Sequence, residues 1–384
     1  MVKYHIMQHS IKRRVQTIIE KKLNPGFVVV LFGARRTGKT VLMNEIKKNL
    51  QNADVIHVQG EDLEVAEILS SSKLSVLKQF LKGYKYLFID EAQEIPDIGK
   101  NLKLIVDNIS EISVFITGSS AFNLHGETGE PLVGRSLFLK LYPFAISELQ
   151  ENFLQMKQTL SEKLIYGMYP QIITSTNVSE KQTILESLKN GYLLKDILRL
   201  DNLKNSIFII DLLRLIAFQI GHDISYSELA KQLKVNVRTV QRYLDILEKT
   251  FVLFSVRGFS RNLRKEISKS PRYYFWDNGI RNIIIANFNN LNIRQDTGQL
   301  WENFCVSERL KHLSNNQVLT NYYFWRTYDQ QEIDLIEERS GNIYAFEFKF
   351  GNKKAKIPKV FASTYQNSEF KTINPDSFHE FLGV

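Results

Sequence analysis

The sequence has few of the residues that mark disulfide-bonded, zinc-binding or membrane proteins. It contains one cysteine, Cys305, and seven histidines in 384 residues, so internal disulfides are excluded and no cluster has zinc-ligand spacing. Cys305 lies on an apolar helical face and is expected in the core, without the neighbouring histidine that nucleophilic use needs. No apolar run approaches the roughly 18 residues that span a bilayer, and the opening segment lacks the apolar middle of a signal peptide. We therefore expect a soluble, cytoplasmic protein without a membrane partner.

Positive charge is the first feature that the sequence has in excess. The net charge is +9, and it is concentrated between Lys231 and Arg272. That segment contains eleven basic and three acidic residues, a net charge of +8. Such concentration favours an acidic partner such as nucleic acid, and the alternative is a basic surface that serves solubility alone.

The segment LFGARRTGKTVLM, residues 31–43, contains a phosphate-binding pattern. Residues 33–40 fit G-x-x-x-x-G-K-[ST], after an apolar run expected as a buried strand and before a predicted helix. The glycines let backbone amides face phosphate oxygens, Lys39 is expected to reach the β- and γ-phosphates, and Thr40 is expected to ligate Mg²⁺. The alternative for Arg35 and Arg36 is to cap the outer face of the loop. The predicted nucleotide contacts here are Gly33, Ala34, Arg35, Arg36, Thr37, Gly38, Lys39, Thr40 and Val41.

Two further strand ends complete the predicted ATP site. The segment YKYLFIDEAQEIP resembles a Walker B motif, in which Asp90 holds the Mg²⁺ water shell and Glu91 orients the attacking water. The strand ISVFITGSS ends at the same sheet edge, and Ser119 is the predicted sensor of the γ-phosphate. The alternative for Ser119 is a local helix cap, because Gly-Ser-Ser is a common N-cap. The three strand ends together predict a P-loop ATPase that binds ATP with Mg²⁺.

Several segments carry a resemblance to a known family. GARRTGKTVLM, LFIDEAQEIP, FITGSSAFNL and GRSLFLKLYPFAISEL, in this order, resemble a family of bacterial and archaeal AAA-type ATPases whose carboxyl-terminal domain is largely uncharacterised. GMYPQI and WENFCVSERL resemble later segments of that family, although residues 167–170 depart from its usual paired glycines. The resemblance implies a phosphate-sensing or intersubunit role for Arg135 and a homo-oligomer. The alternative for Arg135 is an ion pair at the surface.

The middle of the chain has helical apolar spacing. Residues 145–204 resemble the helical lid that follows an AAA core. Residues 205–275 contain a helix, a short turn and a second helix, followed by a strand that could form a wing, which predicts a winged helix-turn-helix. The alternative is a winged helix used only for packing or protein contacts. The predicted DNA contacts, at the start of the second helix, are Arg238, Thr239, Gln241 and Arg242.

The carboxyl-terminal third contains a spaced set of carboxylates. Asp334 follows a strand-like segment, and Glu347 and Lys349 alternate on the strand IYAFEFKF, so that they share one face. With Glu302 on a preceding helix, the set resembles the PD-(D/E)XK nuclease core. In that core Glu302, Asp334 and Glu347 would hold Mg²⁺ or Mn²⁺, and Lys349 would position or activate the water. The alternative is ordinary charge alternation on a half-buried strand.

These observations predict an α/β protein of four parts. They are an AAA-like P-loop ATPase core with a parallel sheet (residues 1–144), a helical lid (145–204), a winged helix-turn-helix (205–275) and a restriction-endonuclease-like domain (276–384). The predicted function is ATP hydrolysis coupled to a DNA-associated, nuclease-like unit. The alternative is a nucleotide-dependent switch or scaffold that binds protein partners, with a catalytically silent nuclease-like domain.

Overall fold

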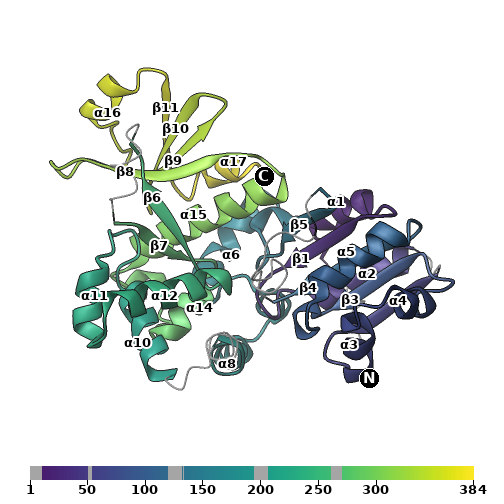
Figure 1. The fold of residues 1–384 in the computed structure, drawn as a ribbon. Helices are drawn as coiled ribbons and strands as arrows, with labels where there is room; N and C mark the ends of the chain where they lie inside the picture. The colour runs from purple at the N-terminus through teal and green to yellow at the C-terminus, as the bar shows by residue number, and fades with distance from the viewer. Residues whose placement is uncertain (1–10, 51–53, 120–131, 133, 194–205, 261–269) are drawn as a thin grey trace, which may run out of the picture.

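The computed structural model describes the chain except for residues 1–10, 51–53, 120–131, 133, 194–205 and 261–269 (Figure 1). Its described residues form a five-stranded sheet from the amino-terminal part and a six-stranded sheet from the later part. No helix in these described ranges is long and apolar enough to cross a membrane.

The first sheet is parallel, as the α/β prediction requires. Its strands run in the order β2-β3-β4-β1-β5, so β4 lies between the strand before the glycine loop and the strand before the acidic pair. Because all five strands point the same way, their carboxyl ends meet at one edge. The strands are β1 (Val28–Phe32), β2 (Val55–Gln59), β3 (Tyr86–Asp90), β4 (Ser113–Gly118) and β5 (Ser136–Lys140).

Helices cover both faces of this sheet. Alternate residues of β1 enter different apolar clusters: Val29 and Leu31 pack toward α1 (Arg14–Lys22) and α2 (Lys39–Asn49). Val28 and Val30 pack toward α3 (Leu63–Ser70), α4 (Leu74–Phe80) and α5 (Ile98–Asn108). This burial on both faces explains the unbroken apolar run of β1. A one-turn helix, η1 (Ala92–Glu94), follows β3.

The middle of the chain is helical, as predicted for residues 145–204. The described part of this range ends at residue 193, and residues 194–204 lie outside it. Helices α11 and α12 are joined by a turn of three residues, in which Lys234 has a left-handed backbone (φ 55°) and Asn236 caps α12. The apolar spacing predicts that Leu229, Leu233, Val240, Leu244 and Leu247 hold these two helices together. Four of them are buried, and Leu233 is partly buried. The elements are η2 (Ile146–Glu148), α6 (Phe153–Tyr166), α7 (Pro170–Thr174), α8 (Val178–Ser187), η3 (Leu188–Leu193), α10 (Ser206–Ala217), α11 (Tyr226–Leu233) and α12 (Val237–Lys249).

The second sheet joins two of the predicted parts. Strand β6 pairs antiparallel with β7 through its first residues and parallel with β8 through its last two. The boundary predicted between residues 275 and 276 therefore falls within one continuous sheet. Its strands, in the order β11-β10-β9-β8-β6-β7, are β6 (Leu253–Gly258), β7 (Arg272–Phe275), β8 (Asn321–Arg326), β9 (Glu332–Arg339), β10 (Asn342–Phe348) and β11 (Ser368–Ile373).

Helix α15 is the main helix packed on this second sheet (Figure 1). Cys305 on α15 is buried, which confirms its predicted place in the core. The aromatic residues Tyr273 and Trp276 are buried as well. The remaining elements of this region are α14 (Asn278–Ile284), η4 (Leu291–Ile293), α15 (Thr297–Asn315), α16 (Lys359–Thr364) and α17 (Phe378–Leu382).

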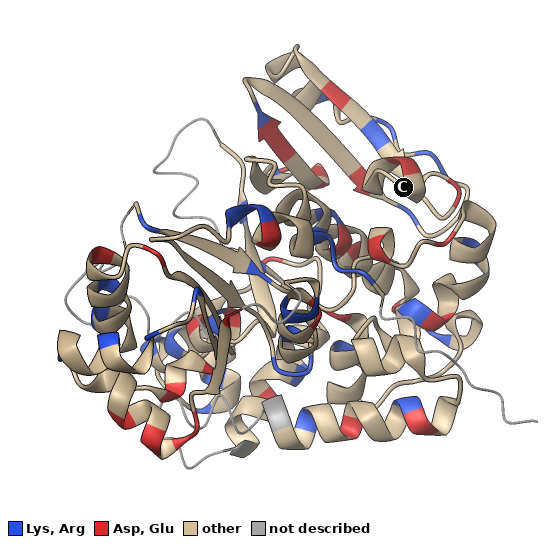
Figure 2. Cartoon of the chain, turned by 90° about the vertical axis from the view of Figure 1, so that its right-hand side faces the viewer, with Lys and Arg blue, Asp and Glu red and all other residues tan. Residues whose placement is uncertain are grey.

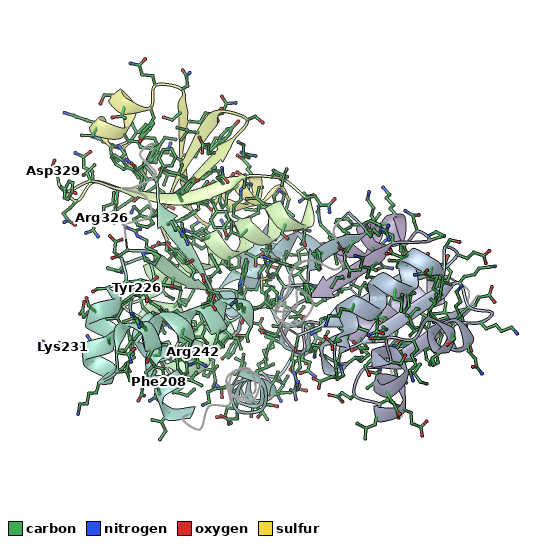
Figure 3. All side chains as sticks on the ribbon, in the orientation of Figure 1. Phe208, Tyr226, Lys231, Arg242, Arg326 and Asp329 are labelled. Carbon is green, nitrogen blue, oxygen red and sulfur yellow. The ribbon has the colours of Figure 1, made fainter. Side chains whose placement is uncertain are left out.

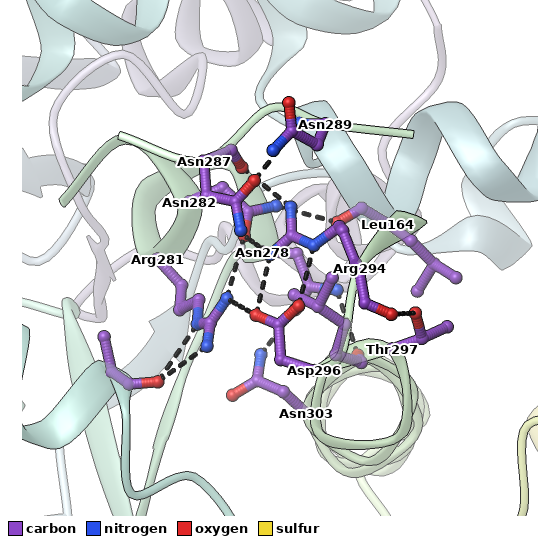
Figure 4. Close-up of polar contacts among 12 residues, drawn as sticks. Leu164, Asn278, Arg281, Asn282, Asn287, Asn289, Arg294, Asp296, Thr297 and Asn303 are labelled. Atoms are coloured by element: carbon purple, nitrogen blue, oxygen red, sulfur yellow. Dashed lines mark hydrogen bonds and ion pairs between the residues drawn. The ribbon is translucent and has the colours of Figure 1, made fainter. Parts of the chain in front are cut away.

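A buried polar cluster joins α14 to α6 and to α15 (Figure 4). The Asn282 amide donates to the carbonyl oxygens of Leu164 and Ile165 at the end of α6, at 3.1 and 2.7 Å. Arg281 donates to the last carbonyl of α10 and forms an ion pair with Asp296, which directly precedes α15. Helix α14 therefore contacts three other helices through hydrogen bonds as well as through packing.

Candidate functional site

The glycine loop lies between β1 and α2 at the carboxyl edge of the first sheet. Gly33 passes so close to β5 that a Cβ atom would lie 2.2 Å from the Leu141 carbonyl oxygen, and Gly38 is left-handed (φ 97°). Both positions therefore require glycine. The Lys39 ammonium group is buried and donates to the carbonyl oxygens of Gly33 and Ala34, at 2.9 and 3.1 Å. Lys39 thus lies across the loop that it was predicted to serve.

The acidic end of β3 faces the first turn of α2. The Thr40 hydroxyl donates to Asp90 Oδ2 at 2.6 Å, and the Thr117 hydroxyl on β4 donates to the other oxygen of that carboxylate. Asp90 is buried. The hydroxyl and carboxylate oxygens at the loop are hard donors of the type that Mg²⁺ prefers, so these residues fit the predicted cation.

Gln93 links the predicted catalytic carboxylate to the predicted sensor. Its side-chain amide donates to Glu91 Oε2 at 2.5 Å and to the Ser119 hydroxyl at 3.3 Å, while its oxygen accepts from the Ser119 amide. Glu91 itself is left-handed (φ 51°), which turns the chain at the strand end. The sequence analysis missed Gln93, and its only signal was its place two residues after Glu91. Ser120, the next residue of Gly-Ser-Ser, lies outside the described part.

The outer face of the loop contacts helices α7 and α8 of the predicted lid. Arg36 donates to the Ser187 hydroxyl of α8 at 3.1 Å, and a Cβ atom on Gly38 would lie 4.0 Å from Pro170 of α7. Arg35 is half-buried and the Val41 side chain is exposed on α2. In this structure the loop therefore touches both the sheet and the lid.

Arg135 lies at the end of the first sheet that is opposite to the glycine loop. The Val28 amide, at the start of β1, donates to the Arg135 carbonyl oxygen at 2.9 Å, whereas the glycine loop follows the other end of β1. Five residues of strand, about 16 Å at roughly 3.3 Å per residue, separate the two. Arg135 forms an ion pair with Asp107 of α5. In this structure Arg135 therefore lies away from the glycine loop of its own chain, and its phosphate-sensing or intersubunit role stays a prediction.

A second pocket, of about 440 Å³, contains three of the predicted nuclease-like residues: Glu302, Asp334 and Lys349. Asp334 of β9 and Glu347 of β10 fall opposite each other when the antiparallel register is continued by one residue, which puts both side chains on one face. Lys349 donates to Glu347 Oε1 at 2.7 Å. Among the described residues no three His, Cys, Asp or Glu side chains are gathered closely enough to hold a metal ion. The predicted ligands are therefore neighbours in this structure without forming a closed metal cluster.

Electrostatics show that these carboxylates interact. Burial, and then the charges of Glu302 and Glu347, raise the pKa of Asp334 well above its usual range. Burial also raises the pKa of Glu302, against the opposing effects of Arg272 and of a hydrogen bond from Tyr274. Both shifts favour the protonated carboxyl groups, chiefly because the groups are buried. Carboxylate oxygens are nevertheless the donor type that a divalent cation such as Mg²⁺ prefers.

Three of the four predicted DNA contacts are exposed on α12. Arg238, Gln241 and Arg242 lie on its exposed face, and Figure 3 shows Arg242 on the same side of the molecule as Lys231 of α11. The amide and hydroxyl of Thr239 both donate to the Asn236 side chain, at 2.7 and 2.9 Å, so Thr239 is part of the helix cap, and its DNA contact stays a prediction.

The basic segment is also less exposed than its composition indicates. Arg272 is buried in ion pairs with Asp223 and Glu332, and Lys249 pairs with Asp245. Figure 2 likewise shows acidic and basic residues side by side on many helices. Four of the basic residues counted in the segment, Arg261, Arg264, Lys265 and Lys269, lie outside the described part.

Comparison with known proteins agrees with the nucleotide loop. Residues 26–150 match an AAA domain, residues 157–292 a domain of unknown function (DUF8612), and residues 297–376 another domain of unknown function (DUF4143). An uncharacterised protein of Mycobacterium tuberculosis is 25% identical over 88% of this chain and 74% of its own length. An uncharacterised protein of Methanocaldococcus jannaschii is 25% identical over 93% of this chain and 82% of its own.

Two solved structures are also similar to this chain. AMPPCP-bound DnaA from Aquifex aeolicus is 15% identical, covering 61% of this chain and 86% of its own, with a TM-score of 0.29. Cdc6p from Pyrobaculum aerophilum is 16% identical, covering 67% and 87%, with a TM-score of 0.28. The chain therefore contains a region similar to an AAA domain, followed by a region similar to the domain of unknown function DUF4143, and it resembles uncharacterised bacterial and archaeal proteins along most of its length.

Proposed function

We propose that this protein hydrolyses ATP at the glycine loop and that its nucleotide state acts on a DNA-associated, nuclease-like unit in the same chain. The observation that carries the ATPase part is the set of contacts around Asp90. Its carboxylate accepts from Thr40 of the loop and from Thr117 of β4, with Lys39 and Glu91 on either side along the same sheet edge. This set supplies a phosphate cradle, cation ligands and a carboxylate for water in one place.

Each residue of this site has a separate role in the hydrolysis of ATP to ADP and phosphate. Lys39 leaves the loop carbonyls and neutralises the β- and γ-phosphate oxygens. Glu91 accepts a hydrogen bond from a water molecule and aligns its oxygen with the γ-phosphorus. The water oxygen bonds to this phosphorus as the bond to the β-phosphate oxygen breaks, Glu91 takes up the proton of the water, and ADP is the leaving group. Mg²⁺, which Thr40 and Asp90 would hold, supplies charge neutralisation at the β- and γ-phosphates when bound.

Steady-state ATP turnover tests this assignment. Lys39→Ala is expected to lose turnover and nucleotide affinity together, whereas Glu91→Gln is expected to lose turnover and keep binding, because the amide cannot act as a carboxylate base. The matched control is Lys48→Ala, an exposed lysine on the same helix that pairs with Glu45. Undiminished turnover in both site variants would refute the ATPase assignment.

The DNA part of the proposal is supported by the arrangement of α10 to α12 with the antiparallel strands β6 and β7. A helix-turn-helix followed by a strand pair is the arrangement of a winged helix, in which the second helix of the motif faces DNA. Arg238, Gln241 and Arg242 lie on the exposed face of α12. Contacts of this kind with phosphates would position the duplex without specifying its sequence.

The nuclease-like part is supported by the pairing of Asp334 with Glu347 on one face and by Lys349 beside them. A divalent cation bound there would supply Lewis-acid activation of a water molecule and of the scissile phosphate. The test is incubation with linear, branched and single-stranded DNA in Mg²⁺ or Mn²⁺, with Glu347→Ala and Lys349→Ala as site variants. Lys371→Ala, an exposed lysine on neighbouring β11, is the control.

A second function is favoured by one observation: within the described ranges the carboxylates do not form a ready metal cluster. In that case the chain is a nucleotide-dependent switch or scaffold for protein partners, and its nuclease-like domain is silent. DNA substrates left intact by wild type and variants alike, together with ATP turnover, would favour this scaffold.

A further inference from the structure

Strand β7 presents two different faces to two different parts of the molecule. Tyr273 points toward the helix-turn-helix, where its hydroxyl lies 3.0 Å from the Tyr226 hydroxyl of α11. Tyr274, the next residue, points the other way and donates its hydroxyl hydrogen to Glu302 Oε1 at 2.8 Å. One strand of the predicted winged helix therefore contacts a carboxylate of the nuclease-like pocket.

Gly221 packs closely against that carboxylate at the pocket. A Cβ atom at Gly221 would lie 2.5 Å from Glu302 Oε2 and 2.7 Å from Oε1, and the Gly221 backbone is left-handed (φ 77°). Any larger residue at position 221 would therefore displace the carboxylate. Gly221 and Glu302 both line the pocket that contains Asp334 and Lys349. With Oε1 occupied by Tyr274, Oε2 is the oxygen left for a ligand.

The walls around Glu302 are held by a buried guanidinium group. Arg272, two residues before Tyr274 and on the same face of β7, donates to Asp223 at 3.1 Å and to Glu332 at 2.9 Å. Its guanidinium carbon lies 4.3 Å from the centre of the Phe324 ring. These contacts tie the turn after α10, the start of β9 and β8 to one strand, so Tyr274 has a fixed position relative to the pocket.

We propose that Tyr274 is a positioning residue that fixes Glu302 as a ligand for a divalent cation in this pocket, so that β7 completes the site. The inference rests on the nuclease-like part of the proposed function. A carboxylate ligand whose second oxygen is hydrogen-bonded keeps one orientation and presents one oxygen to the metal. Asp334 and Glu347 supply the other oxygens.

The test measures Mn²⁺ binding directly, by calorimetry without nucleotide and in an Asp90→Asn background that removes the acidic residue of the ATP site. Tyr274→Phe keeps the ring and its burial and removes only the hydroxyl. Loss of such a supporting contact is expected to weaken Mn²⁺ binding about 10-fold to 100-fold. Tyr273→Phe is the matched control, because it removes a buried hydroxyl from the adjacent residue on the opposite face, and its Mn²⁺ affinity is expected to match the background.

The outcomes separate the inference from the function on which it rests. Mn²⁺ binding that Glu302→Gln does not weaken, or no binding at all, would refute the metal site and the inference together. Binding that depends on Glu302 but is equal in Tyr274→Phe and the background would refute the positioning role alone. Equal losses in the Tyr273 and Tyr274 variants would assign the effect to packing of β7 and also overturn the inference. If the wild type cleaves DNA, Tyr274→Phe is expected to raise the metal concentration needed for half-maximal rate while keeping kcat at saturating metal.

Discussion

The buried cluster around Asp296 makes a quantitative prediction. Asp296 forms ion pairs with Arg281 and with Arg294, whose side chains are 2% and 0% exposed, and the Arg294 contact measures 2.8 Å (Figure 4). Asp296→Asn keeps the size of the side chain and removes the charge. It leaves two guanidinium groups in the protein interior without their shared carboxylate.

The magnitude follows from the pKa of Asp296. Although burial opposes it, hydrogen bonds and charge from Arg294 and Arg281 lower this pKa from 3.8 to about 2. A pKa difference of about 1.8 corresponds to a stabilisation of about 2.4 kcal/mol, since one pKa unit equals about 1.36 kcal/mol. Solvent screening of the partly exposed carboxylate reduces this stabilisation to about 2 kcal/mol. The uncompensated guanidinium groups add to the cost, since removing one partner of a buried pair costs about 3–5 kcal/mol. We expect a loss of about 3 kcal/mol at neutral pH.

Urea unfolding measures this loss. With a slope of about 3 kcal/mol/M, the midpoint is expected to fall by about 1 M. Because the pKa is lower in the folded than in the unfolded state, the stabilisation is complete above about pH 4 and is lost as the pH falls toward 2. The difference between wild type and Asp296→Asn should therefore shrink across that window. Asp245→Asn, which breaks an exposed pair with Lys249, is expected to cost less than about 0.5 kcal/mol. A cost as small in Asp296→Asn, or one independent of pH, would refute the reasoning.

Three further predictions concern the proposed sites. Gln93→Ala is expected to lower kcat for ATP about tenfold with little change in KM, because Glu91 loses the amide that orients it; an unchanged kcat would remove Gln93 from the site. Replacing both Arg238 and Arg242 by Ala is expected to lower the slope of log DNA affinity against log salt by about 2, at roughly 0.9 for each phosphate contact; fluorescence anisotropy measures it, and an unaltered slope would contradict phosphate contacts at α12. Arg135→Ala is expected to leave ATP affinity within about twofold of wild type in calorimetry, because Arg135 lies at the opposite sheet edge; a tenfold loss would contradict that placement.

The nucleotide loop was predictable because its chemistry is local. Residues of one strand–loop–helix segment are neighbours in the chain, so a glycine spacing and a Lys-Thr pair specify their own arrangement. Asp90 needed only one more inference, that parallel strands end at the same edge. The hydrogen bond from Thr40 to Asp90 agrees with both steps.

The features that sequence reasoning missed depend on which elements meet. The strand order puts Ser119 beside Gln93, and no spacing in the sequence encodes that order. Arg135 directly precedes β5, which runs parallel to β1, so it lies at the amino edge of the sheet. Thr239 is a polar residue of the type that contacts DNA, but its amide donates to the Asn236 side chain, which caps the helix. A count of basic residues treats Arg272 as a surface charge. Its burial becomes visible only in the structure, where β6 and β8 join in one sheet.

In the proposed function, nucleotide state has to reach the second pocket through α14. The glycine loop touches α7 and α8. The loop before α7 is held to α14, because the Met168 amide donates to Asp277 at 2.6 Å. Asn282 and Arg281 then join α14 to α6 and, through Asp296, to the start of the helix that carries Glu302. Binding linkage is reciprocal, so a nucleotide that alters cation affinity in the pocket is itself bound differently when the cation is present. Asp296→Asn breaks the last of these contacts and should reduce that mutual effect while the direct contacts of both sites, Thr40 with Asp90 and Tyr274 with Glu302, stay in place.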